Sequence, residues 1–255
     1  MRCHALALAL VALVSGESRP DAPPPLQQSH AWIVVATGAP ERAKLEEAGF
    51  RIAPTTNRHD GQGTASISIE LLDGYLELIY PDPSVPVSPE RQAGAEKFRQ
   101  KSAWRTSGYC PIGIVFDRTN ATPATFPFPT WRVSADWMEP GTSIEMLTPR
   151  EIPKALSLSI SSHARSAREV NEELAKDPKR NAMFQHPNGA RRLTRLRVIA
   201  PAGEDALPPS ASWVSAQGRL DIAPGPAWLL DVTLDGGAQG RTADLRPDLP
   251  MLVHY

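Results

Sequence analysis

Residues 73–80, DGYLELIY, form the most informative segment of this chain, because they read as a buried strand with one carboxylate in its middle. Side chains alternate between the two faces of a strand, so Glu77 shares a face with Tyr75 and Ile79. An ionised carboxylate is costly to bury unless another group compensates it. Glu77 therefore indicates a polar site against one face of a sheet, and the alternative is a strand residue turned to solvent.

The residues upstream of this strand predict a βαβββ unit. HAWIVVATG (30–38) is rich in β-branched residues, and APERAKLEEAGF (39–50) has the Pro and Gly positions of a short helix. Three further strand-like runs follow: FRIAPTT (50–56), TASISIELLD (64–73) and GYLELIY (74–80). Alternation in the first strand places His30, Trp32 and Val34 on one face.

The next part of the chain predicts a second, less regular unit. Residues 90–108 indicate an amphipathic helix over one edge of the sheet, with Ala95, Phe98 and Ala103 inward. Strands are predicted in CPIGIVFDR (110–118), TWRVSADWM (130–138), TSIEMLTPR (142–150) and ALSLSISS (155–162). TNATPATFPFP (119–129) stands where a helix would be expected. Two copies of one supersecondary unit are thus predicted to share a core.

The C-terminal part reads as a third set of strands after a polar connector. A helix is predicted in ARSAREVNEELAKD (164–177), and strands in 191–201, 218–224, 226–236 and 250–255. Four arginines between 191 and 197 favour a solvated or anion-facing strand edge over a nucleic-acid patch, since no aromatic residues are interleaved with them.

The N-terminus resembles a targeting segment. Arg2 precedes the apolar run ALALALVALV (5–14), and VSG offers small residues for cleavage. This pattern predicts an exported protein, periplasmic or secreted; a retained N-terminal helix on a cytoplasmic protein is the alternative. The expected division is a signal peptide (1–16), a Pro-rich linker (17–29), a two-module domain (30–163), a polar connector (164–190) and a third β-rich partial module packed on that domain (191–255).

Composition excludes several function classes. The chain has 255 residues, 41% of them hydrophobic, with a formal net charge of −1, which gives no general attraction to nucleic acid. No apolar run is long enough to span a membrane. GxSxG, Walker, paired CxxC and HExxH motifs are absent, so no nucleotide cofactor is expected. A lone Cys110 beyond the leader is a weak candidate nucleophile.

Five pieces of sequence in order resemble the glyoxalase-like domain proteins of the vicinal oxygen chelate superfamily. They are HAWIVV, AGF, RHDGQGTASISI, GYLELI and QHPNGARRLTRLRV, between residues 30 and 198. The resemblance implies an α+β fold in which paired βαβββ modules form a curled half-barrel sheet, here with an additional C-terminal β-rich module. It also implies a small-molecule ligand and a divalent metal, with His30 and Glu77 at the ligand positions of the first module. An imidazole and a carboxylate suit Zn, Fe, Mn, Co or Ni.

The second module departs from the family pattern. Its first strand offers Cys110, Gly113 and Val115, and its fourth offers serines and a terminal His163. Either a third ligand comes from elsewhere, with His59, His163 and His186 as candidates, or no metal is bound. The predicted ligand pocket comprises Trp32, His59, Tyr75, His163 and His186.

Two functions from different classes follow. The first is a divalent-metal-dependent lyase, isomerase or dioxygenase acting on a vicinal-oxygen substrate, with Glu77 as metal ligand or catalytic base. The second is a metal-free protein of the same fold that binds or sequesters a small molecule, with His30 and Glu77 as a hydrogen-bonded pair. A structural protein with a vestigial pocket would place these two residues apart. Whether modules pair within one chain or in a homodimer stays open.

Overall fold

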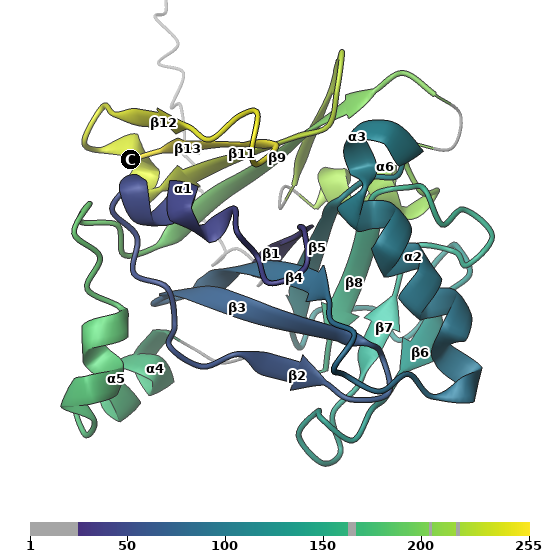
Figure 1. The fold of residues 1–255 in the computed structure, drawn as a ribbon, viewed down its shortest axis with the longest axis horizontal. Coiled ribbons are helices and arrows are strands. Elements are labelled where there is room, and N and C mark those ends of the chain that lie inside the picture. The colour runs from purple at the N-terminus through teal and green to yellow at the C-terminus, as the bar shows by residue number, and fades with distance from the viewer. Residues whose placement is uncertain (1–24, 163–166, 204–205, 218–219) are drawn as a thin grey trace, which may run out of the picture.

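Two β-sheets enclose one apolar core in the computed structural model, which describes residues 25–162, 167–203, 206–217 and 220–255 (Figure 1). The predicted signal peptide and most of the predicted linker lie outside these residues, as does His163. Among the described residues no helix is both long enough and apolar enough to cross a bilayer.

The first sheet confirms the prediction of paired modules. Its strand order is β2-β3-β4-β1-β5-β8-β7-β6, so the halves β1–β4 and β5–β8 repeat the same arrangement on either side of its centre. In each half the first strand is parallel to the fourth, and the two first strands, β1 and β5, pair antiparallel. The strands are β1 (Leu26–Val34), β2 (Asn57–His59), β3 (Thr64–Leu71), β4 (Gly74–Pro81), β5 (Ile112–Arg118), β6 (Trp131–Val133), β7 (Ile144–Met146) and β8 (Ser157–Ser161).

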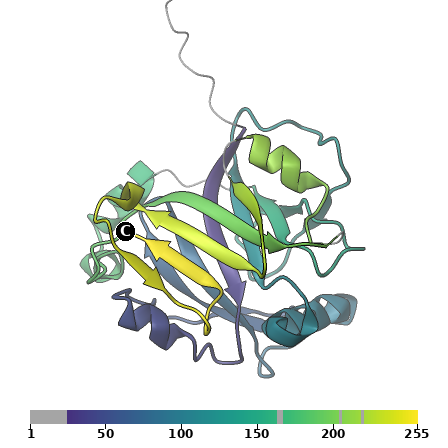
Figure 2. The same ribbon diagram turned by 90° about the horizontal axis from the view of Figure 1, so that it is seen from above.

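One face of this sheet is apolar and faces the second sheet. Ile33, Leu76 and Ile114 are each at most 2% exposed, and their partners on the second sheet include Val198 and Leu230 in the same core. Figure 2 shows the second sheet lying over the first. Its order is β10-β9-β11-β13-β12. The strands are β9 (Leu193–Pro201), β10 (Asp221–Gly225), β11 (Leu229–Leu234), β12 (Thr242–Asp244) and β13 (Met251–His254).

The helices lie around the two sheets. Helix α1 buries Leu45 in the shared core, whereas α2 packs against β4 and β1 instead of the predicted sheet edge. The helical segments are α1 (Arg42–Glu47), η1 (Pro89–Arg91), α2 (Gln92–Ser102), α3 (Trp104–Ser107), α4 (Ala167–Leu174), α5 (Pro178–Met183), α6 (Ser210–Ala216) and η2 (Asp235–Gly237).

The inner face of α2 differs from the prediction at one position. Ala95 is buried as expected, but Ala103 is exposed and Lys101 is buried instead. The Lys101 ammonium donates hydrogen bonds to the carbonyls of Cys110 and Ala155, which offsets the cost of burying it. Hydrophobicity alone therefore misassigned the inner face of this helix.

Two strand predictions were wrong in detail. Residues 50–56 form no strand; Phe50 enters the core from a loop, and its ring lies 5.9 Å from the ring of Tyr255. The strand that pairs with β3 is instead β2, in a segment that the sequence predicted to be a turn. β1 begins at Leu26 and not at His30, since Leu26 is fully buried and pairs with Arg118. Strand β12 and helices α5 and α6 were not predicted.

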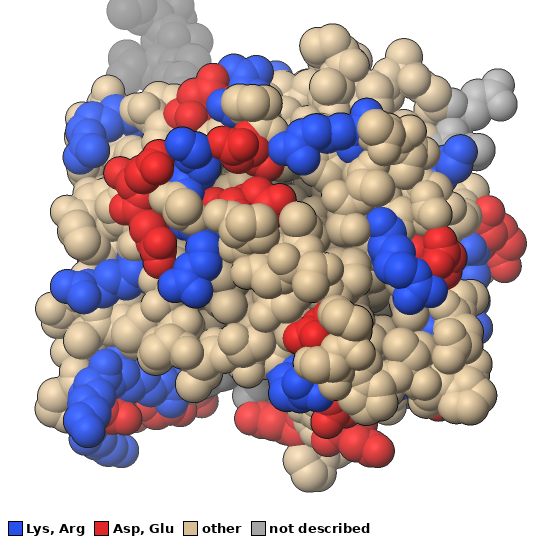
Figure 3. Space-filling view, in the orientation of Figure 1, with Lys and Arg blue, Asp and Glu red and all other residues tan. Residues whose placement is uncertain are grey.

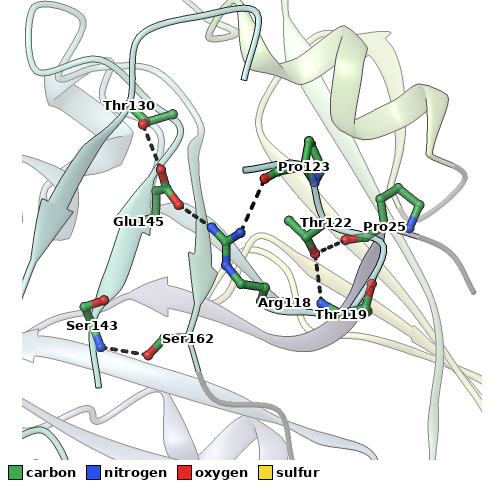
Figure 4. Close-up of polar contacts among 9 residues, drawn as sticks. All are labelled: Pro25, Arg118, Thr119, Thr122, Pro123, Thr130, Ser143, Glu145 and Ser162. Carbon is green, nitrogen blue, oxygen red and sulfur yellow. Dashed lines mark hydrogen bonds and ion pairs between the residues drawn. The ribbon is translucent and has the colours of Figure 1, made fainter. Parts of the chain in front are cut away.

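The irregular connection in the second module is confirmed, and polar contacts hold it in place (Figure 4). Arg118, at the end of β5, forms an ion pair with Glu145 of β7. Glu145 also accepts a hydrogen bond of 2.9 Å from the Thr130 hydroxyl, and Thr122 donates to the carbonyl of Pro25. These contacts fix a loop where the first module has α1.

On the face seen in Figure 3, Lys and Arg side chains are interspersed with Asp and Glu side chains, and broad areas between them carry no charge. Exposed pairs such as Arg42–Glu46, at 2.9 Å, join neighbouring residues of one helix. Such pairs contribute well under about 1 kcal/mol each, so packing and not surface charge stabilises this fold.

The closest approach across the β1–β5 pair predicts the effect of a single methyl group. A Cβ added at Gly113 would lie 2.0 Å from Trp32 Cζ2. We expect Gly113→Ala to lower the free energy of unfolding by about 1–3 kcal/mol in urea denaturation, because the indole must move. Gly94→Ala, in α2 with nothing within 4 Å, is the control and should raise it by up to about 1 kcal/mol. Equal effects of the two substitutions would contradict the packing described.

Candidate functional site

The face of the first sheet opposite the core carries two rows of aligned residues, and we call it the polar face. Residues paired across neighbouring strands point to the same side of a sheet. The His30 row therefore runs through Glu70, Tyr75, His30, Val115, Ser159 and Met146. The Glu77 row runs beside it through Ser68, Glu77, Trp32, Gly113 and Ser157.

The alternation that builds this face is visible in the sequence of two strands. In β3, TASISIEL, hydroxyl or acidic side chains alternate with apolar ones, and β8, SLSIS, repeats the pattern. Apolar members face the core, so the serines are placed on the opposite side while still buried: Ser66 is 0% and Ser159 is 5% exposed. This period of two was a readable signal for Ser66, Ser68 and Glu70, which the site prediction missed.

His30, Tyr75 and Glu77 lie together at the centre of the polar face. The imidazole stacks on the phenol ring at 4.0 Å between centroids, and the Tyr75 hydroxyl lies 3.2 Å from His30 Nε2. Glu77 Oε2 lies 3.9 Å from the same nitrogen, and the Ser29 hydroxyl lies 3.2 Å from Nδ1. The structure thus brings together the two residues of the predicted metal site and Tyr75, which stacks on one of them.

Burial sets the protonation states of this group. Desolvation lowers the pKa of His30 to about 3, so the imidazole is neutral at neutral pH. Desolvation raises the pKa of Glu77 to about 7; nearby Glu70 raises it further and the Ser66 hydroxyl opposes the shift. Burial, followed by the charge of Glu77, also raises the pKa of Tyr75 well above its usual value. At neutral pH the site therefore holds a carboxyl group poised between its two forms.

A buried hydroxyl lies beside Glu77. Ser66 Oγ is inaccessible to solvent, and its hydrogen bond to the Glu77 carboxylate lowers the pKa of that group, against the effect of burial. Buried polar groups in proteins are nearly always bonded to protein or water. Glu77 therefore supplies the partner that the buried Ser66 hydroxyl needs.

Trp32 and His59 occupy the polar face at some distance from each other. Trp32 covers Gly113 and lies against Phe98 of α2, with 6.2 Å between ring centroids. His59 pairs with Thr64 at the far end of β3 and bonds its hydroxyl at 2.9 Å. From Thr64 to Ser68 an extended strand covers roughly 13 Å, so His59 is not a neighbour of the Glu77 row.

His186 lies outside the polar face and its ring is fully engaged. Its Nδ1 accepts a hydrogen bond of 3.1 Å from the backbone N–H of Arg51, and its Nε2 lies 2.9 Å from the Glu70 carbonyl, to which it donates. No ring nitrogen is left to contact a ligand. Its role is to tie the chain around residue 186 to the edge of β3.

Among the residues that the structure describes, which leave out the candidate ligand His163, the donor set does not fit the metal that the family pattern implies. Among the described residues no group of three or more His, Cys, Asp or Glu side chains is placed to hold an ion. His30 and Glu77 supply two donors, whereas catalytic metal sites commonly use three protein ligands. In the second module Gly113 and Ser157 occupy the row in which a further ligand would stand.

A further acidic residue on this face was not anticipated. Asp117 of β5 is 6% exposed, and its charge contributes to the raised pKa of Tyr75. Cys110, by contrast, is fully buried and desolvation raises the pKa of its thiol to about 11, which makes it a poor nucleophile.

Comparison with known proteins gives one family match. The family model described as glyoxalase-like domain matches residues 29–214, which leaves β10 to β13 beyond the matched segment. Among curated proteins none matches significantly. A solved structure, described as the crystal structure of a hypothetical protein from Staphylococcus aureus, is similar with a TM-score of 0.41 and 10% identity, covering 82% of this chain and 91% of that one.

The match spans both modules of the first sheet, and their strand order repeats as that family's paired-module pattern requires. The chain therefore belongs to the glyoxalase-like domain family.

Proposed function

We propose that this protein binds a small organic molecule against the polar face and exchanges a proton with it through Glu77, as a metal-independent isomerase or lyase would. The observation that carries the proposal is a buried carboxyl group, its pKa raised to about 7 by desolvation, that lies 3.9 Å from a neutral imidazole. A general base works best when its pKa is near the working pH. Structural roles alone do not require this combination.

Each neighbouring group has a defined part in this proposal. Glu77 takes the proton, and neutral His30, 3.9 Å away, accepts or donates a hydrogen bond without adding charge. Tyr75 stays protonated because its pKa is raised, so its hydroxyl can donate to an oxygen on which negative charge develops. A ligand that binds without turnover would use the same contacts, and this is the sequestering alternative.

The metal-dependent alternative keeps one observation in its favour. His30 Nε2 and Glu77 Oε2 lie 3.9 Å apart on adjacent strands, close enough to share one ion. Metal analysis of protein purified without added metal separates the two candidates. Stoichiometric Zn, Fe, Mn, Co or Ni that both His30→Ala and Glu77→Gln lose would establish the metal-dependent reading.

Ligand binding tests the site directly. We would screen a library of small organic fragments by ligand-observed NMR and compare variants. Tyr75→Phe should weaken bound fragments about 2–10-fold, the value of one hydrogen bond, and Glu77→Gln should weaken them about 10-fold or more. Tyr109→Phe, whose ring lies against Lys154 and contacts neither His30 nor Glu77, is the matched control and should change nothing. Fragments that bind all four proteins equally would place the ligand elsewhere.

Stability measured against pH tests the protonation state of Glu77. Its folded pKa of about 7 exceeds its ordinary 4.5, so its proton stabilises the fold at low pH and this contribution is lost as pH rises through 7. The Glu77→Gln variant has no carboxyl group at this position, so it cannot lose this contribution to stability. The stability of the variant relative to the natural protein should therefore rise by about 2–3 kcal/mol between pH 4.5 and pH 8.

Subtracting the stability of the natural protein from that of the Glu77→Gln variant removes the contributions of other titrating groups. His30, with its lowered pKa, loses stability as pH falls below 6.5, and Lys101, lowered to about 7, gains stability as pH rises above 7. Both groups titrate in the natural protein and in the variant, so their contributions cancel in the difference. Exposed Glu139→Gln is the control and should show a difference independent of pH; urea denaturation at each pH is the measurement. A flat difference for Glu77→Gln would refute the assigned protonation state.

A further inference from the structure

The outer face of the second sheet carries polar side chains on three neighbouring strands. Val232 and Val253 turn toward the core and are fully buried. Asp231 and His254 alternate with them along β11 and β13, so they turn away from the core. Strand pairing places Thr242 of β12 beside His254. Figure 2 looks down on this sheet, whose outer face lies across the shared core from the polar face of the first sheet.

Two hydrogen bonds join three side chains on this outer face. His254 Nε2 lies 2.9 Å from Asp231 Oδ1, and His254 Nδ1 lies 2.9 Å from Thr242 Oγ1. Both distances are those of ordinary hydrogen bonds. The imidazole thus lies between a carboxylate and a hydroxyl, each of which contacts a different ring nitrogen.

The carboxylate determines which ring nitrogen carries the proton. An ionised carboxylate can only accept hydrogen bonds, so the neutral His254 ring donates to Asp231 from Nε2. Its Nδ1 is then unprotonated and accepts the hydrogen bond of the Thr242 hydroxyl. An alcohol is activated as a nucleophile by this order of groups, in which a base contacts the hydroxyl and a carboxylate orients the base.

The hydroxyl is also accessible from solvent. Thr242 is exposed on β12, an edge strand of the sheet, whereas the side chains of His254 and Asp231 are 36% and 18% exposed. A ligand can therefore reach the hydroxyl while the carboxylate lies deeper. All three residues follow residue 214, where the family match ends, so the resemblance gives them no role.

We propose that these three residues form a second reactive site, at which Thr242 takes the acyl group of a small activated ester. Thr242 Oγ1 forms a bond to the carbonyl carbon and gives its proton to His254 Nδ1. The bond between that carbon and the leaving oxygen breaks, and the leaving alcohol takes the proton from Nδ1. The products are a threonine ester and a free alcohol. Asp231 is a positioning residue, since it acts through the imidazole.

Acetylation by 4-nitrophenyl acetate tests this inference. The full chain is treated at about pH 8, where imidazole side chains are ordinarily neutral, and the acetylated residues are located by peptide mass spectrometry. Thr125, an exposed threonine in the connection between β5 and β6, is the internal reference. We expect Thr242 to react at least about 100-fold faster than Thr125, since a general base contributes about 100-fold or more. His254→Gln should remove this advantage, and Thr242→Ser should keep it.

A second readout isolates the role of Asp231. NMR of the imidazole nitrogens shows which of them carries the proton, and we expect Nε2 for His254 in the natural protein. The amide of Asp231→Asn can donate to Nε2, so this variant should move the ring proton to Nδ1 and slow the acetylation of Thr242 about 10-fold or more. Asp136→Asn, at an exposed position between β6 and β7, is the matched control and should change neither quantity.

Four results would each overturn the inference. They are equal acetylation of Thr242 and Thr125, an unchanged rate at Thr242 in His254→Gln, a natural protein with the His254 proton on Nδ1, and an Asp231→Asn variant that matches the natural protein in both readouts. None of them bears on the proposed function, which the fragment screen tests at a different sheet face. Circular dichroism of each variant confirms that it is folded.

Discussion

The antiparallel pairing of β1 with β5 is the contact on which the rest of this structure depends. It joins the two halves of the first sheet and sets their register, with His30 opposite Val115 and Trp32 opposite Gly113. A slip of one residue would turn every side chain of one half to the other face. The Trp32 indole occupies the space that a side chain at position 113 would fill, so this packing is possible only in the register that places Trp32 opposite Gly113.

The two faces of the sheet are stabilised in different ways. On the core side, residues from both sheets form one apolar cluster, which supplies the main driving force for folding. On the polar side, Glu77 and His30 are buried at a cost that their contacts with each other do not fully offset, and their pKa values shift as a result. The stability contributed by the core is what allows an unfavourable arrangement to persist at the site, as is common for functional groups.

The sequence contained the modules, the two central residues and the irregular connection, because each left a local pattern. Alternation around Glu77 and the β-branched run after His30 predicted that both residues lie on strands. The family resemblance predicted that those two strands lie side by side. The remaining features depended on distant contacts. Asp117 and Glu70 bear on the site only because their charges act on Tyr75. Lys101 is buried because the carbonyl of a residue distant in the sequence accepts its hydrogen bond. Phe50 joins the core without belonging to a strand. His186 looked like a ligand until two backbone groups were found to occupy its ring.

The period of two in β3 has a consequence for how such a protein can change over generations. Ser66, Ser68 and Glu70 are interleaved with Ala65, Ile67 and Ile69, yet the two sets touch different surroundings. Substitutions at the even positions therefore alter chemistry with little effect on the core, and those at the odd positions do the reverse. Selectivity and robustness can accordingly drift as nearly independent traits encoded in a single short strand.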